Sequence, residues 1–233
     1  MTIHPIKAFS DNYIWIIEEG TEAIVVDPGE ATQVIDYLEK KQLQLNSILL
    51  THNHDDHIGG VQKILTKYPD VLIYGPKETE QVANHIVGEG DSFNLLNDDF
   101  RVLKTGGHTN GHISFLTKDA LFCGDALFSA GCGRVFTKDY QAQYDALQKF
   151  KELDNEVKVY AAHEYTQTNL RFAHAMRPSN TLISEALSDV NNLRLKGEPT
   201  LPTTIGKEKS INLFLQAEKM EDFKKLRKAR DEF

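Results

Sequence analysis

Residues 51–57 read Thr-His-Asn-His-Asp-Asp-His, and this stretch decides how the rest of the chain is interpreted. It brings together four side chains that bind divalent metals, His52, His54, Asp56 and His57. Neutral imidazole and carboxylate are preferred ligands of zinc and related ions. Three of the nine histidines in the chain fall in this window, so a metal site explains the stretch better than a solvated polar loop does.

The backbone expected around this stretch leaves room for two metals. The apolar residues 47–50 predict a strand that ends where the ligands begin, and helical spacing starts a few residues after them. Residues two apart in an extended chain face the same way, so His52 and His54 can reach one metal together. Asp56 and His57 lie where the chain tightens into a helix and point elsewhere, which makes a second metal beside the first geometrically reasonable.

The wider pattern of apolar residues predicts the fold class. Strands alternate with helices until about residue 161, which is typical of sheets covered by helices in an α/β layered architecture. Beyond residue 163 we expect no strand, and the chain becomes helical and more charged. The prediction is a main domain over residues 1–164 and a helical C-terminal domain over residues 165–233. The expected strands are 13–17, 23–27, 47–51, 71–74, 101–105, 113–116, 120–123 and 157–161; the expected helices are 61–68, 140–151 and 182–193.

Composition excludes several classes of protein. With 40% hydrophobic and 26% charged residues over 233 positions, the chain is an ordinary globular protein. Its formal charge of −8 argues against nonspecific nucleic-acid binding, which needs a surplus of Lys and Arg. No secretory signal and no apolar run of roughly 18 residues is present, so we expect a cytoplasmic protein that does not associate with membranes. The two cysteines, Cys123 and Cys132, are too few for a disulfide framework and are expected to be reduced.

Further candidate ligands stand at the ends of later strands. His108 follows one apolar run, Asp125 ends another and His163 ends a third. Each alone is a weak signal, because a single polar residue at a strand end is more often a cap or a hydrogen-bonding group. Together they repeat one arrangement, and loops at one edge of a layered fold can converge on a site. Asp27, in a turn after a strand, is expected to serve that turn, with support of the site as the alternative, and His112 is expected to support the site through a hydrogen bond rather than to form it.

These motifs resemble, in their order along the chain, those of the metallo-β-lactamase superfamily. Within it, the sequence looks like the glyoxalase II, or hydroxyacylglutathione hydrolase, family. The likeness runs from about residue 11 to residue 233. The superfamily motifs are residues 51–57, Gly107-His108, Gly124-Asp125 and Ala162-His163; the family stretches are DNYIW at 11–15, GHTNGH at 107–112, FSAGCGR at 128–134 and HEYT at 163–166.

The resemblance implies an αββα sandwich, the metallo-β-lactamase fold, with a C-terminal helical appendage and two divalent metal ions. Zinc is the first expectation, with iron or manganese as alternatives. The implied ligands are His52, His54 and His108 for one ion and Asp56, His57 and His163 for the other, with Asp125 bridging the two.

The reaction implied is hydrolysis of S-(2-hydroxyacyl)glutathione, chiefly S-D-lactoylglutathione, to glutathione and D-lactate, the second step of methylglyoxal detoxification. A hydroxide that bridges the metals would attack the thioester carbonyl. Asp125 would hold the metal pair, and Asp56 is the candidate proton acceptor when the intermediate collapses. The leaving thiol has a pKa of about 8.5 and departs as a thiolate without a strong acid, so no serine or cysteine nucleophile is required.

The resemblance also assigns substrate-binding residues. On charge alone, the basic segment at residues 219–230 is either a solvated helix face or a site for a small anion. The family likeness favours the second, with Arg227 and Arg230 binding the glycine carboxylate of glutathione, and Arg134 and Tyr165 lying beside the cleft. A guanidinium suits this task because its planar fork donates two hydrogen bonds to one carboxylate.

Three positions depart from the family pattern. Phe136 stands where some members have a tyrosine that contacts glutathione, so one hydrogen bond to the substrate would be missing. Gln216 stands where arginine is frequent, which we interpret as a structural difference. Arg230 in place of lysine keeps the charge and changes its geometry.

Other functions of related proteins fit the sequence less well. A related one-iron enzyme oxidises glutathione persulfide, but the intact Asp56, His57 and His163 argue against a single-iron site. A β-lactamase would need a secretory signal, and a nuclease fits poorly with an acidic chain. A noncatalytic metal sensor would leave the substrate-binding arginines unexplained. We expect a monomer, because no exposed apolar helix face requires a partner.

Overall fold

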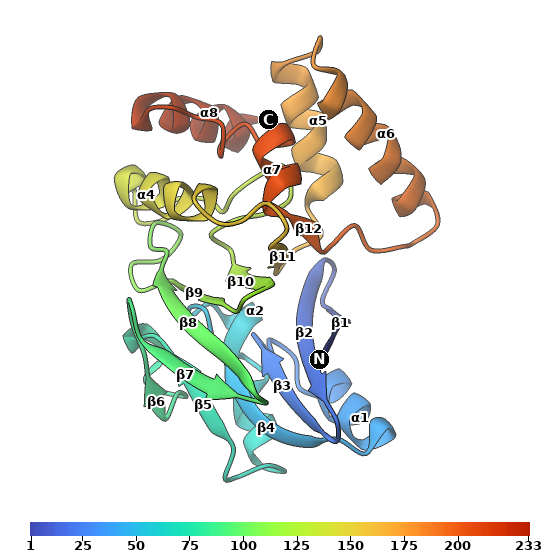
Figure 1. The fold of residues 1–233 in the computed structure, drawn as a ribbon, viewed down its shortest axis with the longest axis vertical. Helices are drawn as coiled ribbons and strands as arrows, with labels where there is room; N and C mark the ends of the chain where they lie inside the picture. Colours follow the sequence, from blue (N-terminus) through green and yellow to red (C-terminus); the bar gives the residue numbers. More distant parts are fainter. The chain divides into compact units, whose positions relative to one another are not determined.

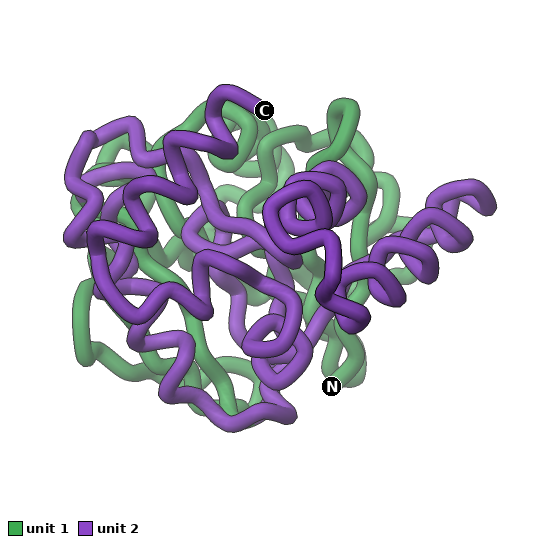
Figure 2. The backbone as a smooth tube through the Cα atoms, turned by 90° about the horizontal axis from the view of Figure 1, so that it is seen from above, with its two compact units in different colours: residues 1–104, 111–118 green, residues 105–110, 119–233 purple.

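The computed structural model describes residues 1–233, which fall into two compact units. Unit 1 comprises Met1–Lys104 and Gly111–Lys118, and unit 2 comprises Thr105–Asn110 and Asp119–Phe233 (Figure 2). None of the helices combines the length and the apolarity needed to cross a membrane.

Unit 1 contains a six-stranded mixed sheet in the order β1-β2-β3-β4-β5-β6 (Figure 1). The first three strands are antiparallel, and β3 to β6 run parallel to one another. Parallel strands need crossover connections, and these carry the helices of the unit. The strands are β1 (Thr2–Ala8), β2 (Asn12–Glu19), β3 (Glu22–Val26), β4 (Gln44–Leu49), β5 (Leu72–Gly75) and β6 (His85–Ile86); the helices are α1 (Thr32–Lys41), α2 (Asp55–Ile58), α3 (Val61–Leu65) and the 3-10 turn η1 (Lys77–Thr79).

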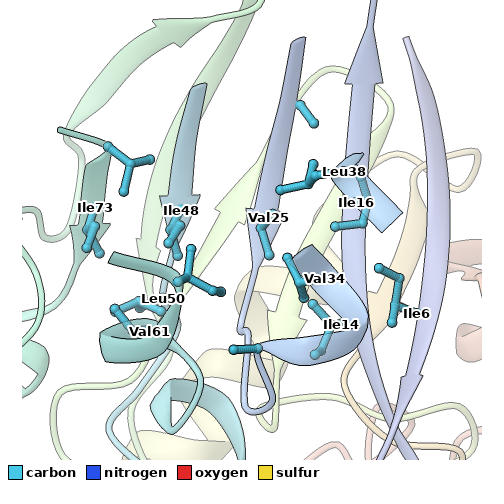
Figure 3. Close-up of a cluster of buried hydrophobic side chains, with 14 of the residues drawn as sticks. Ile6, Ile14, Ile16, Val25, Val34, Leu38, Ile48, Leu50, Val61 and Ile73 are labelled. Carbon is cyan, nitrogen blue, oxygen red and sulfur yellow. The ribbon is translucent and has the colours of Figure 1, made fainter. Parts of the chain in front are cut away.

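A hydrophobic cluster joins α1 to one face of this sheet. Val34 and Leu38 on α1 are fully buried, and they share the cluster with Ile14, Val25 and Ile48 from three neighbouring strands (Figure 3). Full burial of one such side chain contributes about 1.5–3 kcal/mol. Strand β2, which contains Ile14, also buries Tyr13, Trp15 and Ile17. Both faces of this strand are therefore covered, and its sequence is a continuous apolar run rather than an alternating pattern.

Unit 1 also contains an antiparallel ladder of three strands, β7 (Ser92–Leu95), β8 (Asp98–Lys104) and β9 (Ile113–Leu116). The rings of Phe93 and Phe100 stack across β7 and β8, with centroids 5.9 Å apart. At the start of β9, the backbone N–H of Ile113 donates to the carbonyl of Thr51 at 2.9 Å. This hydrogen bond ties the ladder to the first residue of the 51–57 stretch.

Unit 2 contains a short mixed ladder and five helices. Strand β10 (Ala120–Gly124) runs parallel to β11 (Lys158–Ala161), which pairs antiparallel with β12 (Thr203–Thr204). A second buried cluster includes Leu170 of α5, Ile183 and Val190 of α6, and Ile211 of α7. The helices are α4 (Tyr140–Lys151), α5 (Thr166–Met176), α6 (Thr181–Leu195), α7 (Ile205–Ile211) and α8 (Met220–Glu232).

The eight strands and three helices expected from the sequence are all present, with ends shifted by a few residues. The expectation of no strand beyond residue 163 is wrong, because β12 pairs with β11. A strand of two residues is too short to leave an apolar pattern. The sequence also gave no notice of α1 or β1. In β1, Pro5 interrupts the strand pattern, and the structure accommodates it because β1 lies at the edge of the sheet.

The cluster under α1 makes a prediction about stability. Replacing Leu38 with alanine removes a fully buried side chain, so the free energy of unfolding should fall by about 2–5 kcal/mol in a denaturant titration. Lys40→Ala, on the exposed side of the same helix, is the matched control and should change it by less than about 0.5 kcal/mol. Equal effects of the two substitutions would contradict the role given to this cluster.

Candidate metal and active site

The ligand stretch of unit 1 starts in an extended conformation and ends in a helix. His54 has φ −71° and ψ 146°, and α2 starts at the next residue. His52 and His57 are buried, and their ring centroids lie 4.0 Å apart. The Nε2 atom of His52 lies 3.0 Å from Nδ1 of His54, so both rings turn a nitrogen toward the same point. The expected pairing of His52 with His54 is therefore present in the geometry of this unit.

Asp27 holds this stretch in place. One of its carboxylate oxygens accepts the backbone N–H of Thr51 at 2.8 Å, and the other accepts the Thr51 hydroxyl at 2.7 Å. The second oxygen also lies 3.0 Å from Nδ1 of His57. A carboxylate on Nδ1 fixes the tautomer of the imidazole and leaves Nε2 to bind a cation. The sequence was compatible with either a turn or a supporting role for Asp27. In the structure its carboxylate contacts both Thr51 and His57.

Asn12 performs a similar task for Asp56. This asparagine is buried in β2, and its Nδ2 donates to the Asp56 carboxylate at 2.9 Å. The backbone is also packed tightly here, because a Cβ atom on Gly29 would lie 1.9 Å from the Asp56 carbonyl oxygen. Only glycine fits that position. No role for Asn12 was predicted from the sequence, although this residue lies in the Asp11-Asn12-Tyr13 part of a family motif.

His112 packs against the same group of rings. It is fully buried, and its ring stacks on His52 with centroids 4.8 Å apart and an interplanar angle of 27°. The next residue, Ile113, donates its N–H to the Thr51 carbonyl. His112 thus limits how the His52 ring can turn, in agreement with the supporting role expected for it.

Unit 2 brings two further candidate ligands, His108 and His163, to the carboxylate of Asp125. One oxygen of this carboxylate lies 3.2 Å from Nε2 of His108, and the other lies 3.3 Å from Nε2 of His163. Asp125 and His163 meet because β10 and β11 are parallel, with Gly124 opposite Ala161 at the ends of the two strands. Each oxygen of this carboxylate thus faces a different imidazole, so the three side chains could hold cations together.

A backbone carbonyl orients His108. Its Nδ1 lies 2.9 Å from the carbonyl oxygen of Arg134, which leaves Nε2 directed at Asp125. The approach is close, because a Cβ on Gly133 would lie 2.0 Å from the Asp125 carbonyl oxygen and 2.9 Å from Nδ1 of His108. The Gly131-Cys132-Gly133 sequence therefore allows the loop to contact the ligand set directly.

The predicted substrate-binding side chains all lie in unit 2 and differ in exposure. Arg134 is 57% exposed, whereas Arg227 is only 5% exposed. Arg230 is partly buried, and burial together with the nearby charge of Arg227 lowers its pKa. The Tyr165 ring stacks on His163 with centroids 4.7 Å apart. Three guanidinium groups thus occur near one another beside the ligands of this unit.

The positions that depart from the family pattern have distinct surroundings. Phe136 is exposed, with its ring 5.3 Å from the His108 ring and 5.9 Å from the guanidinium of Arg134. Gln216 accepts a hydrogen bond from Arg177 at 2.7 Å and donates one to a backbone carbonyl. The amide of Gln216 thus serves packing within the helical part of the chain, as expected of a structural difference.

Neither cysteine is suited to act as a nucleophile. Cys123 and Cys132 are both buried and free, as expected from their number. Burial raises the pKa of both thiols, so the thiolate form is disfavoured. The histidine and carboxylate groups are therefore the chemically useful ones in this region.

Comparisons with known proteins identify the family of this chain. Residues 9–163 match the metallo-beta-lactamase superfamily, and residues 164–233 match the hydroxyacylglutathione hydrolase C-terminus. Relatives named hydroxyacylglutathione hydrolase from Glaesserella parasuis and Haemophilus ducreyi are 53% and 51% identical, over the whole of both chains. The chain belongs to the hydroxyacylglutathione hydrolase family. The family, the hydrolase class and the metallo-β-lactamase superfamily predicted from the sequence are confirmed.

Solved structures support the fold of this hydroxyacylglutathione hydrolase family member. ETHE1 from Myxococcus xanthus is 26% identical, with a TM-score of 0.75 over 98% of this chain and 90% of that one. The BLEG-1 B3 metallo-beta-lactamase is 22% identical, with a TM-score of 0.70 over 93% and 99% of the two chains. At that identity the likeness concerns the fold alone. The predicted α/β metallo-β-lactamase fold with a C-terminal helical part is confirmed.

The contacts of Asp27 predict an effect on metal binding. Asp27→Asn keeps the size of the side chain and removes the charge that orients His57, so affinity for zinc should fall by about 10- to 100-fold. Competition with a chromophoric chelator measures this affinity. Asp55→Asn, an exposed carboxylate of the same stretch, is the control and should leave it unchanged. Wild-type affinity in the Asp27 variant would refute the orienting role.

Proposed function

We propose that the protein hydrolyses the thioester of S-(2-hydroxyacyl)glutathione, chiefly S-D-lactoylglutathione, to glutathione and D-lactate. This reaction is the second step of methylglyoxal detoxification. The observation that carries the proposal is full-length identity of about one half with relatives named for this activity, including the C-terminal family region at residues 164–233. We further propose that residues 1–164 form the metal-binding domain and that residues 165–233 form a helical domain that helps to bind glutathione.

The side chains fit two divalent cations by their chemistry. Five imidazoles and two carboxylates are available, and Asp27 and the Arg134 carbonyl leave Nε2 of His57 and of His108 to act as ligands. We assign zinc first, with iron or manganese as alternatives, because this ligand set suits all three. The proposed assignment is His52, His54 and His108 to one cation, Asp56, His57 and His163 to the other, and Asp125 to both.

When bound, such cations lower the pKa of a coordinated water and polarise the substrate carbonyl. The residues of the chain supply position and proton transfer. Asp56, whose carboxylate Asn12 holds, is the proposed acceptor of a proton as the tetrahedral intermediate collapses. The glutathione thiol leaves easily as a thiolate, so a separate acid is not needed. The buried Cys123 and Cys132 take no part.

Recognition of glutathione is proposed to use the basic and aromatic groups of unit 2. Its carboxylates are matched by Arg134, Arg227 and Arg230, and Tyr165 stacks beside the proposed ligand His163. We also propose that the protein acts as a cytoplasmic monomer without nucleic acid, in keeping with its acidic charge and its two free thiols.

An activity assay tests the proposal directly. Protein loaded with zinc should hydrolyse S-D-lactoylglutathione with kcat/KM of about 10⁴ M⁻¹s⁻¹ or more. The reaction is measured by the loss of thioester absorbance and by the release of thiol. A chelator should abolish turnover, and zinc should restore it. Two control substrates test the alternative functions. Hydrolysis of a chromogenic β-lactam would indicate a β-lactamase, and oxygen uptake with glutathione persulfide would indicate persulfide oxidation. The absence of thioester hydrolysis at full metal occupancy would rule out the proposed function.

The contact between Asn12 and Asp56 yields a second test. Asn12→Ala removes one hydrogen bond to a carboxylate, worth about 1.5 kcal/mol, so kcat at saturating zinc should fall by about tenfold with KM unchanged. Asn46→Ala, at an asparagine of β4 whose side chain bonds Glu22, is the control. A rise in KM without a fall in kcat would show that Asn12 acts on substrate binding instead.

A further inference from the structure

The last turn of α8 contains a carboxylate between two of the predicted substrate arginines. Oδ1 of Asp231 accepts a hydrogen bond from Nε of Arg134 at 3.2 Å and another from Nη2 of Arg227 at 3.1 Å. Asp231 is neither a proposed metal ligand nor one of the residues proposed to bind glutathione. Its position is nevertheless specific, because it joins the C-terminal helix to the loop at residues 131–134.

We propose that Asp231 is a positioning residue, which together with the buried Arg227 fixes the guanidinium of Arg134 to bind a carboxylate of the substrate. In this arrangement Arg134 contacts the substrate, and Arg227 holds Asp231 in place. The inference rests on the proposed function, since it specifies how the glutathione part of the thioester is recognised.

The surroundings of Arg227 are those of an anchor. It is 5% exposed, and its guanidinium lies over the ring of Phe214 at 5.1 Å. Its Nη1 donates to the carbonyl of Cys132 at 2.7 Å, and its Nη2 donates to Asp231. Both terminal nitrogens thus donate hydrogen bonds within the protein, and the buried Nε has no hydrogen-bond partner. Arg227 therefore ties the Cys132 carbonyl to the Asp231 carboxylate.

The surroundings of Arg134 are those of a binding group. Its side chain is 57% exposed, and the one hydrogen bond that it donates, to Asp231, uses Nε. The guanidinium has five N–H donors, so both terminal nitrogens are left to bind a carboxylate in the two-pronged geometry. The ring of Phe136, 5.9 Å away, limits its movement on another side.

Charge explains why the carboxylate is needed. Arg134, Arg227 and Arg230 repel one another, and Arg227 and Arg134 both contribute to lowering the pKa of Arg230. Asp231 lies between the first two and offsets part of this repulsion. The cluster retains more positive than negative charge, so it still attracts an anion. Without Asp231, Arg134 would lose its acceptor and would be pushed away from Arg227.

The test compares two substrates in one set of variants. The substrates are S-D-lactoylglutathione and the same thioester with its glycine carboxylate converted to an amide. Asp231→Ala should raise KM for the first by about tenfold and leave kcat within about twofold, because one charge-assisted contact of the binding group is lost. KM for the amide should stay unchanged. Asp231→Asn, which keeps an acceptor oxygen, should give an intermediate KM for the first substrate.

Two controls separate positioning from general damage. Glu232→Ala removes the adjacent exposed carboxylate and should behave as wild type with both substrates. In an Arg134→Ala background, adding Asp231→Ala should change KM no further. Thermal unfolding of each variant, and calorimetric titration with glutathione itself, show whether the folded protein binds the product more weakly.

Each remaining outcome counts against the inference. Equal KM changes for the two substrates, unchanged KM for both, a lower KM, or full additivity with Arg134→Ala would overturn it. Turnover of S-D-lactoylglutathione by the wild type together with any of these results leaves the proposed function standing. A wild-type protein that hydrolyses neither thioester defeats the proposed function, and this inference with it.

Discussion

The buried carboxylate of Asp27 connects the end of one strand to the ligand stretch that follows the next. Strands β3 and β4 are parallel neighbours, so their C-terminal ends lie at the same edge of the sheet. Asp27 follows β3 and accepts two hydrogen bonds from Thr51, which follows β4, while it also contacts His57. A buried carboxylate costs free energy unless it is fully bonded, so the fold and the orientation of the ligand depend on the same contacts.

In unit 2, a pair of adjacent parallel strands likewise brings candidate ligands together. Parallel β10 and β11 bring Asp125 and His163 together, and a loop carbonyl orients His108 toward the shared carboxylate. In both units an imidazole proposed to bind metal is held on its Nδ1 side by an oxygen of another residue. Orientation is thus provided before any cation arrives, which reduces the reorganisation needed for binding. The glycines at positions 29 and 133 permit the close backbone approach that these contacts require.

The sequence predicted what depends on local pattern and on motif, and it missed what depends on distant contacts. The strands that carry the ligands and the ligand stretch itself leave clear local signals. By contrast, Asn12 reaches Asp56 across 44 positions, and Arg227 reaches Cys132 across 95. Neither pairing leaves a periodic trace. The burial of Arg227 could not be predicted either, because an arginine in a basic segment is expected to be exposed unless its partners are known.

A second buried group links the C-terminal helices to the loop that carries Arg134. Glu208 of α7 accepts hydrogen bonds from the Ser129 hydroxyl and the Ala130 N–H, at 2.9 and 2.7 Å. Burial raises its pKa, and the hydrogen bonds oppose that shift by stabilising the carboxylate. Glu208 therefore holds the start of residues 129–134, and Arg227 holds their middle at Cys132. Through this loop, buried side chains of the C-terminal helices can influence the proposed contact between Arg134 and glutathione.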